Sequence, residues 1–152
     1  MPHVHEKIDY AADLLIVNGD AVLLRMHDKY HMWLAPGGHV ELDEDFVEAA
    51  LREAKEETGI DAKLIGKVST AEDDLGRELL LPAFINRHRI NDVHEHISFI
   101  YFGTSDTREL NPAPGETTDG FKWFTRDELS DPKYGVSKRI QMYANAALDA
   151  VS

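Results

Sequence analysis

Three glutamate residues at a helical spacing are the clearest chemical signal in this 152-residue sequence. Glu53, Glu56 and Glu57 are three and four positions apart, so on a helix their side chains share one face and can converge on one point. Carboxylates held so close repel each other in water, and a hard divalent cation such as Mg²⁺ or Mn²⁺ turns that repulsion into binding. Taken alone, the three residues also fit a solvated acidic helix face supported by Arg52.

A helix is predicted over residues 44–59, where it would carry these glutamates. Its apolar face recurs at positions i, i+3, i+4 and i+7 and comprises Val47, Ala50, Leu51 and Ala54. Glu44 is the first acid of the segment, where negative charge suits a helix N-terminus, and Gly59 is placed to end the helix. The glutamates lie off the apolar face and are therefore free to meet a ligand.

The wider spacing resembles the Nudix box. The fixed positions are filled by Gly38, Glu44, Arg52, Glu53, Glu56, Glu57 and Gly59, with Ala54 and Ile60 at the aliphatic places. A chance match is very improbable, because each fixed residue type makes up only about 6–7% of average sequences. The entry Trp33–Gly38 also resembles that of the family, although Asp43 stands where many members carry glycine. The resemblance runs from about Ala11 to the last predicted helix.

The resemblance implies a metal-dependent pyrophosphohydrolase. Its substrate would be a nucleoside diphosphate linked to another moiety, such as a nucleoside triphosphate, ADP-ribose, a dinucleoside polyphosphate or a sugar nucleotide. The implied ligands of Mg²⁺, or of Mn²⁺, are the backbone carbonyl of Gly37 and the carboxylates of Glu53, Glu56 and Glu57. Arg52, Glu53 and Glu57 are predicted catalytic residues, with Arg52 orienting a carboxylate by a charge-assisted hydrogen bond. Glu44 would lie in an outer layer or serve a further metal.

A further acid is expected in the loop before the predicted strand 121–124. The resemblance implies that this loop supplies a general base or an extra metal ligand. Glu116 is the predicted residue and Asp119 is its substitute; a solvent-exposed loop acid is the alternative for either.

The predicted substrate-binding residues are Arg25, Gly38 and Tyr101. Arg25 ends the second apolar run and is either a phosphate clamp, since arginine suits bidentate phosphate contact, or a surface cation. Tyr101, like Trp33 and Phe84, could stack on a base, but scattered aromatic residues more often fill the core.

Three histidines, His88, His94 and His96, form a second group. His94 and His96 share one face of a predicted strand, and such a pair can bind zinc. No third ligand at a fixed spacing is visible, which favours polar strand positions, and contact with substrate phosphate or base is a third interpretation.

The surrounding elements predict an α/β or α+β fold with a mixed sheet. Apolar runs at 9–17 and 21–26 flank Asn18-Gly19-Asp20, a strong hairpin signal. The other predicted strands are 62–69, 93–102 and 121–124, together with an extended segment, 78–90, in which Pro82 indicates an edge or a bulge. A short helix is expected from Arg126, and a last one after Ser137 as N-cap, burying Ile140, Tyr143, Ala144, Ala147 and Leu148. The order β-β-β-α-β-β-β-β-α fits the α/β/α sandwich that the Nudix resemblance implies.

Composition narrows the possible partners. A net charge of −12 disfavours a nucleic-acid duplex or an anionic membrane as partner, so a polyphosphate ligand must meet local cations. There is no cysteine for a disulfide or a thiol nucleophile. We expect one domain over residues 1–152, in the cytoplasm, acting on a small nucleotide-type molecule, with a homodimer possible through 78–90. The main alternative is a ligand-sensing domain of the same fold without activity, although such domains usually have eroded boxes.

Overall fold

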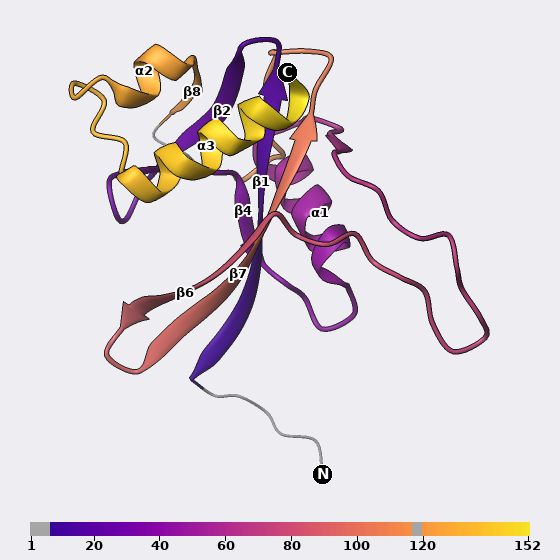
Figure 1. Cartoon of the computed structure of the whole chain (residues 1–152). Helices are drawn as coiled ribbons and strands as arrows, with labels where there is room; N and C mark the ends of the chain where they lie inside the picture. Colours follow the sequence, from indigo (N-terminus) through magenta and orange to yellow (C-terminus); the bar gives the residue numbers. More distant parts are fainter. Residues whose placement is uncertain (1–6, 117–119) are drawn as a thin grey trace.

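One mixed sheet lies between two helical layers in the computed structural model, which describes residues 7–116 and 120–152 (Figure 1). The strands are β1 (Ile8–Asn18), β2 (Ala21–His27), β3 (Met32–Leu34), β4 (Gly37–His39), β5 (Lys63–Leu64), β6 (Phe84–Asn91), β7 (His94–Thr104) and β8 (Phe121–Phe124). The helices are α1 (Phe46–Thr58), α2 (Arg126–Ser130) and α3 (Lys138–Val151). The predicted α/β/α sandwich with a mixed sheet is confirmed.

Strand β1 organises the sheet. It pairs in parallel with β7, from Ile8 opposite Glu95 to Val17 opposite Thr104, and antiparallel with β2 and β4. The segment from Leu14 to Val17 is fully buried and apolar, as expected of a strand covered on both faces. β1 therefore lies between β7 and β4, the strand that carries Gly37 and Gly38.

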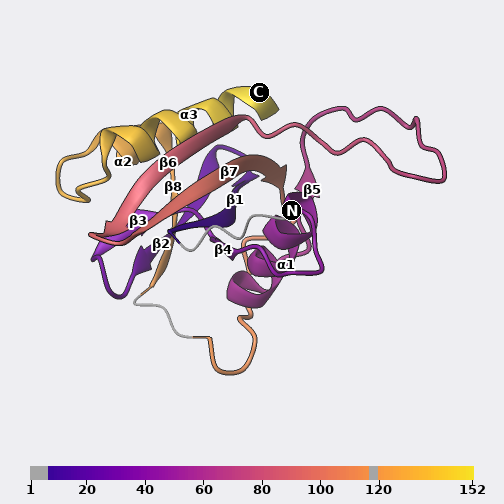
Figure 2. The same cartoon turned by 90° about the horizontal axis from the view of Figure 1, so that it is seen from below.

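Helix α1 lies on one side of the sheet and α2 and α3 lie on the other (Figure 2), and each face has its own core. On one face α1 packs on a cluster that includes Ala12, Leu14, Ile16, Leu23, Ala50, Ala54 and Tyr101. On the other face α2 and α3 pack on a cluster that includes Leu15, Val17, Leu24, Phe124, Tyr143 and Leu148. Burial of side chains on alternating faces therefore fixes the register of the central strands.

Helix α1 begins at Phe46, two residues later than predicted. Asp45 is the N-cap, and its side chain accepts a hydrogen bond from the backbone N–H of Glu48 at 2.8 Å. Glu44 therefore lies before the helix and is not in its first turn, which corrects the prediction. Gly59 ends the helix as predicted, with a φ of 77° that favours glycine.

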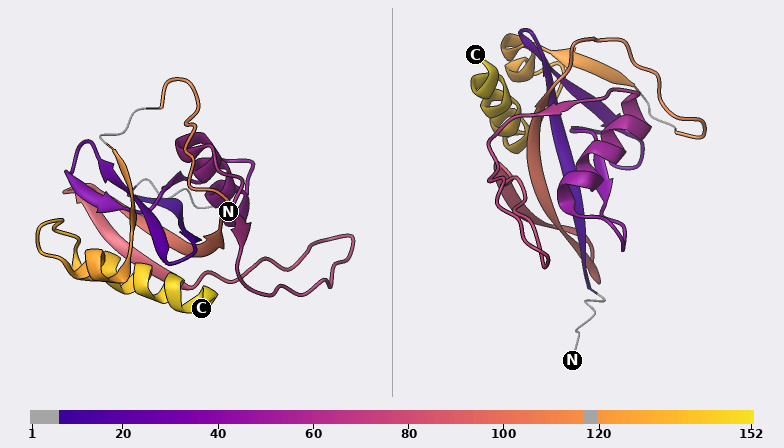
Figure 3. Two further views of the ribbon diagram at one scale, coloured as in Figure 1. Left: turned by 90° about the horizontal axis from the view of Figure 1, so that it is seen from above. Right: turned by 90° about the vertical axis from the view of Figure 1, so that its right-hand side faces the viewer.

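Two predicted extended segments are much shorter than expected. The segment 62–69 forms a strand only at β5, because the chain leaves the sheet around Gly66, whose φ is 133°. The segment 78–90 becomes a strand only from Phe84, after Pro82. Between β5 and β6 the chain makes a long exposed excursion, which contains an isolated bridge between Glu72 and Arg77 (Figure 3).

The other elements follow the predictions closely. The β1–β2 hairpin turns at Gly19-Asp20, as predicted, whereas two short strands, β3 and β4, precede α1 where the predicted order had one. Ser137 caps α3, and the five residues predicted for its apolar face are all buried. None of the helices in the described part of the chain has the length and apolarity needed to cross a membrane.

Candidate active site

The polar face of α1 meets the backbone of β4 at very short range. The Gly37 N–H donates to Glu57 Oε2 at 3.3 Å, and a Cβ on Gly38 would lie 2.5 Å from Glu53 Oε1. A Cβ on Gly37 would lie 2.0 Å from Asp13 Oδ1, so this residue lies between two carboxylates. Any larger residue at either position would clash with these carboxylates, so both positions require glycine. The Gly37 carbonyl as a metal ligand and Gly38 as a substrate-binding residue stay predictions.

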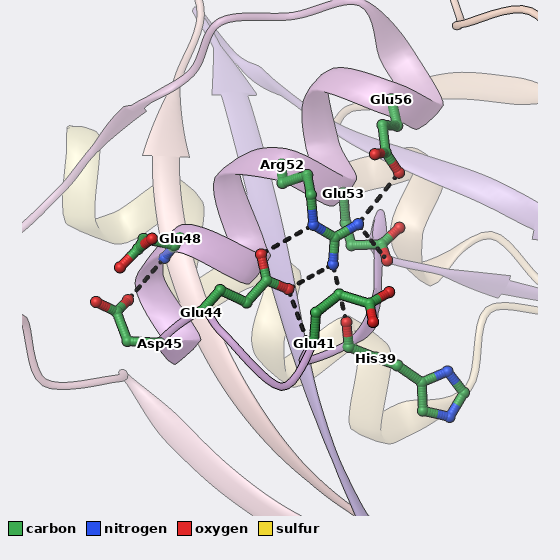
Figure 4. A network of polar contacts seen from close by, with 8 residues as sticks. All are labelled: His39, Glu41, Glu44, Asp45, Glu48, Arg52, Glu53 and Glu56. Carbon is green, nitrogen blue, oxygen red and sulfur yellow. Dashed lines mark hydrogen bonds and ion pairs between the residues drawn. The ribbon is translucent and has the colours of Figure 1, made fainter.

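The guanidinium group of Arg52 donates hydrogen bonds to three glutamates of the box (Figure 4). Its Nε and Nη2 donate to the two carboxylate oxygens of Glu44 at 2.9 and 2.6 Å. Its Nη1 donates to Glu53 Oε1 at 3.0 Å and to Glu56 Oε2 at 3.2 Å, and Nη2 also reaches the backbone carbonyl of His39 at 3.0 Å. Arg52 thus orients carboxylates, as the resemblance implies, and ties the end of β4 to α1.

Glu57 is the most buried of the predicted ligands. It is 5% exposed, and burial raises its pKa to about 8, against the lowering effect of Arg25. The pKa of Glu53 is also raised, because the effect of burial exceeds the opposing effect of the hydrogen bond from Arg52. Arg25 Nε lies 3.1 Å from Glu57 Oε2, an ion pair whose angle falls short of a hydrogen bond. Arg25 therefore faces a carboxylate, and its role as a phosphate clamp stays a prediction.

Glu116 is brought towards the box by the loop that precedes it. The backbone N–H groups of Asn111 and Ala113 donate to the carbonyls of Thr58 and Glu56 at 2.8 Å each, which docks this loop on the C-terminal end of α1. The charge of Glu116 raises the pKa of both Glu53 and Glu57. The structure thus brings the predicted loop acid to the cluster, whereas Asp119 lies outside the described residues.

The acid cluster suits a hard divalent cation. The charges of Glu56 and Glu116 raise the pKa of Glu53, and those of Glu53 and Glu116 raise the pKa of Glu57, so a cation would relieve a repulsion that the nearby arginines only partly offset. The donors are carboxylate oxygens, which Mg²⁺ and Mn²⁺ prefer, and the Glu56 side chain is 43% exposed and can reach a ligand from solvent.

A cavity of about 590 Å³ adjoins this cluster. It is bounded by Arg25, Gly37 and Gly38, each of which lies against a box glutamate. Its lining contains the cations Arg25, Lys29, Arg89 and Arg139 and the single carboxylate of Asp13. In a chain with a net charge of −12, this lining is a local concentration of positive charge.

Sequence reasoning missed Asp13 and Arg139 on the wall of this cavity. Burial raises the pKa of Asp13 to about 7, while Arg25 and Arg139 lower it. A signal for Asp13 was present, because it is an ionisable residue within an apolar strand. Arg139 had no such signal, because only tertiary packing brings the first turn of α3 to the cavity.

Tyr101 is placed differently from the prediction. Its side chain is 2% exposed and belongs to the core under α1, so it packs in the interior and does not line the cavity. The physical reason is strand alternation: Ser98 and Ile100 of β7 face the cavity, and Tyr101 faces the opposite side. Trp33 and Phe84 pack against the core under α3.

The three predicted histidines lie on one wall of the cavity. His88, His94 and His96 all line it, with His39 from β4 beside them. Burial, followed by the neighbouring His39, His88 and His94, lowers the pKa of His96 to about 4, so its imidazole is neutral at pH 7.

Comparison with known proteins identifies similar chains. The NUDIX domain family model matches residues 7–146. A probable DHNTP pyrophosphohydrolase of Lactococcus lactis is 31% identical over 110 residues, 72% of this chain and 62% of that protein. An RNA pyrophosphohydrolase of Bartonella clarridgeiae is 31% identical over 121 residues, 76% and 68% of the two chains. A NUDIX family hydrolase structure from Clostridium perfringens has a TM-score of 0.86 at 31% identity, covering 95% of this chain and 98% of that chain. The match thus spans less than two thirds of the Lactococcus protein.

Proposed function

The chain belongs to the Nudix family, and on that premise we propose that it is a metal-dependent pyrophosphohydrolase. The substrate would be a nucleoside diphosphate linked to another moiety, with cleavage inside the pyrophosphate. The relatives named as DHNTP and RNA pyrophosphohydrolases support hydrolysis of a phosphoanhydride but differ in what they act on.

One observation carries the proposal: three residues that line the cation-rich cavity, Arg25, Gly37 and Gly38, also lie against glutamates of the acid cluster. A polyphosphate entering the cavity would meet Arg25, Arg139 and Lys29, which suit its charge. Its reacting phosphate would then reach Gly37 and Gly38, beside Glu53 and Glu57. Acids alone would repel such a ligand, and cations alone could not hold a metal.

Each group of the site has a distinct part in this proposal. Glu53, Glu56, Glu57 and the Gly37 carbonyl would hold Mg²⁺ or Mn²⁺. When bound, the cation supplies positive charge against the phosphate oxygens. Arg52 fixes the orientation of Glu53 and Glu56, and Glu116 accepts a proton from the water that attacks phosphorus as the anhydride bond breaks. Positioning and electrostatics would carry most of the rate.

The alternative is a ligand-sensing domain without hydrolytic activity. It requires the same cavity but no ordered set of box acids. The hydrogen bonds from Arg52 to Glu44, Glu53 and Glu56 favour an enzyme, because a sensing domain gains nothing from orienting three carboxylates.

Phosphate release tests the proposal directly. The purified chain is incubated with nucleoside triphosphates, ADP-ribose, dinucleoside polyphosphates and sugar nucleotides, each with Mg²⁺, with Mn²⁺ or with chelator. We expect hydrolysis of at least one class, its loss in chelator and its return when metal is restored. Full activity in chelator would refute the mechanism. Binding of these compounds without turnover in either metal would support the sensing domain.

A further inference from the structure

A second set of side chains whose types could hold a metal ion includes three histidines of the cavity wall, His39, His94 and His96. Asp9, His39, His94 and His96 each offer one ligand atom, and these atoms all lie within 4.8 Å of one another. His39 Nε2 is 3.2 Å from His96 Nε2 and 3.8 Å from Asp9 Oδ2, and His94 Nε2 is 3.1 Å from Asp9 Oδ2. This set is distinct from the glutamates of the box.

Strand register brings the four residues together. β1 lies between β4 and β7, and in this arrangement Asp9 is opposite His96 while Ala11 is opposite His39. His94 is two residues from His96, so both imidazoles lie on the same face of β7. The cluster is therefore built on three hydrogen-bonded strands of one sheet and not on a mobile loop.

The separations match those of a tetrahedral transition-metal site. Zinc bonds to histidine nitrogen and carboxylate oxygen are about 2.1 Å long, which separates ligand atoms in a tetrahedron by about 3.4 Å. Three pairs of ligand atoms in the cluster are 3.1–3.8 Å apart, which brackets that value, and all four atoms lie within 4.8 Å of one another. Three imidazoles and one carboxylate also suit Zn²⁺ better than Mg²⁺, which prefers oxygen.

We propose that Asp9, His39, His94 and His96 bind one divalent transition-metal ion, of which Zn²⁺ is the expected example. The side chains of Asp9 and His39 are 50% and 60% exposed, so an ion can enter from solvent. Four protein ligands would close the coordination sphere, which is typical of a structural site.

The position of His39 gives this site a consequence for the catalytic centre. Its ring belongs to the cluster, while its backbone carbonyl accepts a hydrogen bond from Arg52. A bound ion would therefore link β4 to β1 and β7 and restrain the strand that carries Gly37 and Gly38. We expect zinc to raise the melting temperature of the whole chain.

Equilibrium dialysis of the chelator-stripped full chain against ZnCl₂, with Mg²⁺ in large excess, tests the proposal. We expect one tightly held Zn²⁺ per chain, retained in Glu56→Gln, which alters the box, and in His31→Asn, which removes an exposed histidine outside the cluster. His94→Gln and His96→Gln keep a polar side chain of similar reach and should each weaken binding at least tenfold. Zinc retained in both histidine variants but lost in Glu56→Gln would overturn the proposal, as would the absence of zinc binding in the parent.

Two further measurements separate a specific site from surface binding. Zinc at about one hundred times its dissociation constant should raise the parent melting temperature by about 5 °C or more, and this shift should vanish in His94→Gln and His96→Gln. Co²⁺ should give the strong visible absorption of a four-coordinate ion in the parent and in Glu56→Gln. The weak absorption of a six-coordinate ion in both proteins would contradict the proposed ligand set. These readouts do not depend on hydrolysis, so they can fail or succeed independently of the proposed enzyme activity.

Discussion

Arg25 Nε lies 3.1 Å from Glu57 Oε2, and both side chains are largely buried. Arg25 lowers the pKa of a carboxyl that burial raises to about 8. The pair therefore sets how readily Glu57 gives up its proton to a metal, which leads to the first prediction.

Arg25→Met should weaken metal binding near neutral pH. Without the guanidinium the pKa of Glu57 rises further, so protons compete better with the cation. We expect the Mn²⁺ affinity to fall about tenfold at pH 7 and to recover partly at higher pH, as titration calorimetry across the pH range would measure. Arg89→Met removes a cavity cation that is not paired with Glu57 and should leave the affinity nearly unchanged. A loss that is equal at every pH would disprove the link to Glu57.

The metal-free protein should lose stability as pH rises. Glu57 has a folded-state pKa of about 8 against 4.5 when unperturbed. Between these values the folded chain holds a proton that the unfolded chain has released, so each rise in pH favours unfolding. From pH 5 to 8.5 the loss should be on the order of a few kcal/mol. Denaturant melts in chelator would measure it, and Glu57→Gln should flatten the profile; an equal slope in parent and variant would exclude Glu57 as its source.

Glu57→Gln and Ala54→Asp should separate chemistry from folding. The glutamine keeps size and helix propensity but removes an anionic ligand, so turnover should fall by about two orders of magnitude, or about 3 kcal/mol of barrier. The melting temperature of metal-free Glu57→Gln should match or exceed that of the metal-free parent. Ala54 is fully buried, so an aspartate there should unfold the protein or make it insoluble. If Glu57→Gln has a much lower melting temperature than the parent and its folded fraction keeps its activity, the helix acids are structural.

Arg52→Lys should damage activity although the charge is kept. Lysine lacks the planar fork that reaches Glu44, Glu53 and Glu56 together. We expect kcat/KM to fall by about 10–100-fold, or about 1.4–2.7 kcal/mol. Glu44→Gln should cost less, and the double variant should be no worse than Arg52→Lys alone, because both changes release the same network. Strictly additive losses would mean that Glu44 acts independently of Arg52.

Glu116→Gln should lower turnover more than it changes KM. Its loop is docked on the end of α1, and its charge acts on Glu53 and Glu57. We expect kcat to fall by tenfold or more, while Glu109→Gln, an exposed loop acid, serves as the matched control. If Glu116→Gln leaves the rate unchanged and Asp119→Asn lowers it, the role belongs to Asp119. If neither change matters, the base lies within the box.

The sequence predicted what depends on local pattern. The spacing of Glu53 and Glu57 placed both on one face of α1, and Gly59 and Ser137 marked helix ends correctly, because these features depend on neighbours within one or two turns. The start of the excursion after Gly66 was missed, because residues 66–69 were expected to extend a strand but pair with no strand in the part of the chain that the structure describes.

What the sequence could not predict depends on packing between distant strands. His94 and His96 were visible as a pair, but the third and fourth members of their cluster, His39 and Asp9, come from other strands with no fixed spacing. Tyr101 has an aromatic ring that could stack on a base. Its face of β7 is covered by α1, and this follows only from the packing of the helix on the sheet.

The parallel pairing of β1 with β7 also constrains how the protein can fold. Asn18 and Ser105 are hydrogen-bonded across 87 positions of sequence, and contacts of such long range slow folding, because a large loop must close before they form. A chain emerging from the ribosome carries the box helix long before β7 exists, so the helix has no completed sheet on which to bury Ala50 and Ala54. Nascent and C-terminally truncated chains should therefore expose this apolar face, which makes them targets for chaperones.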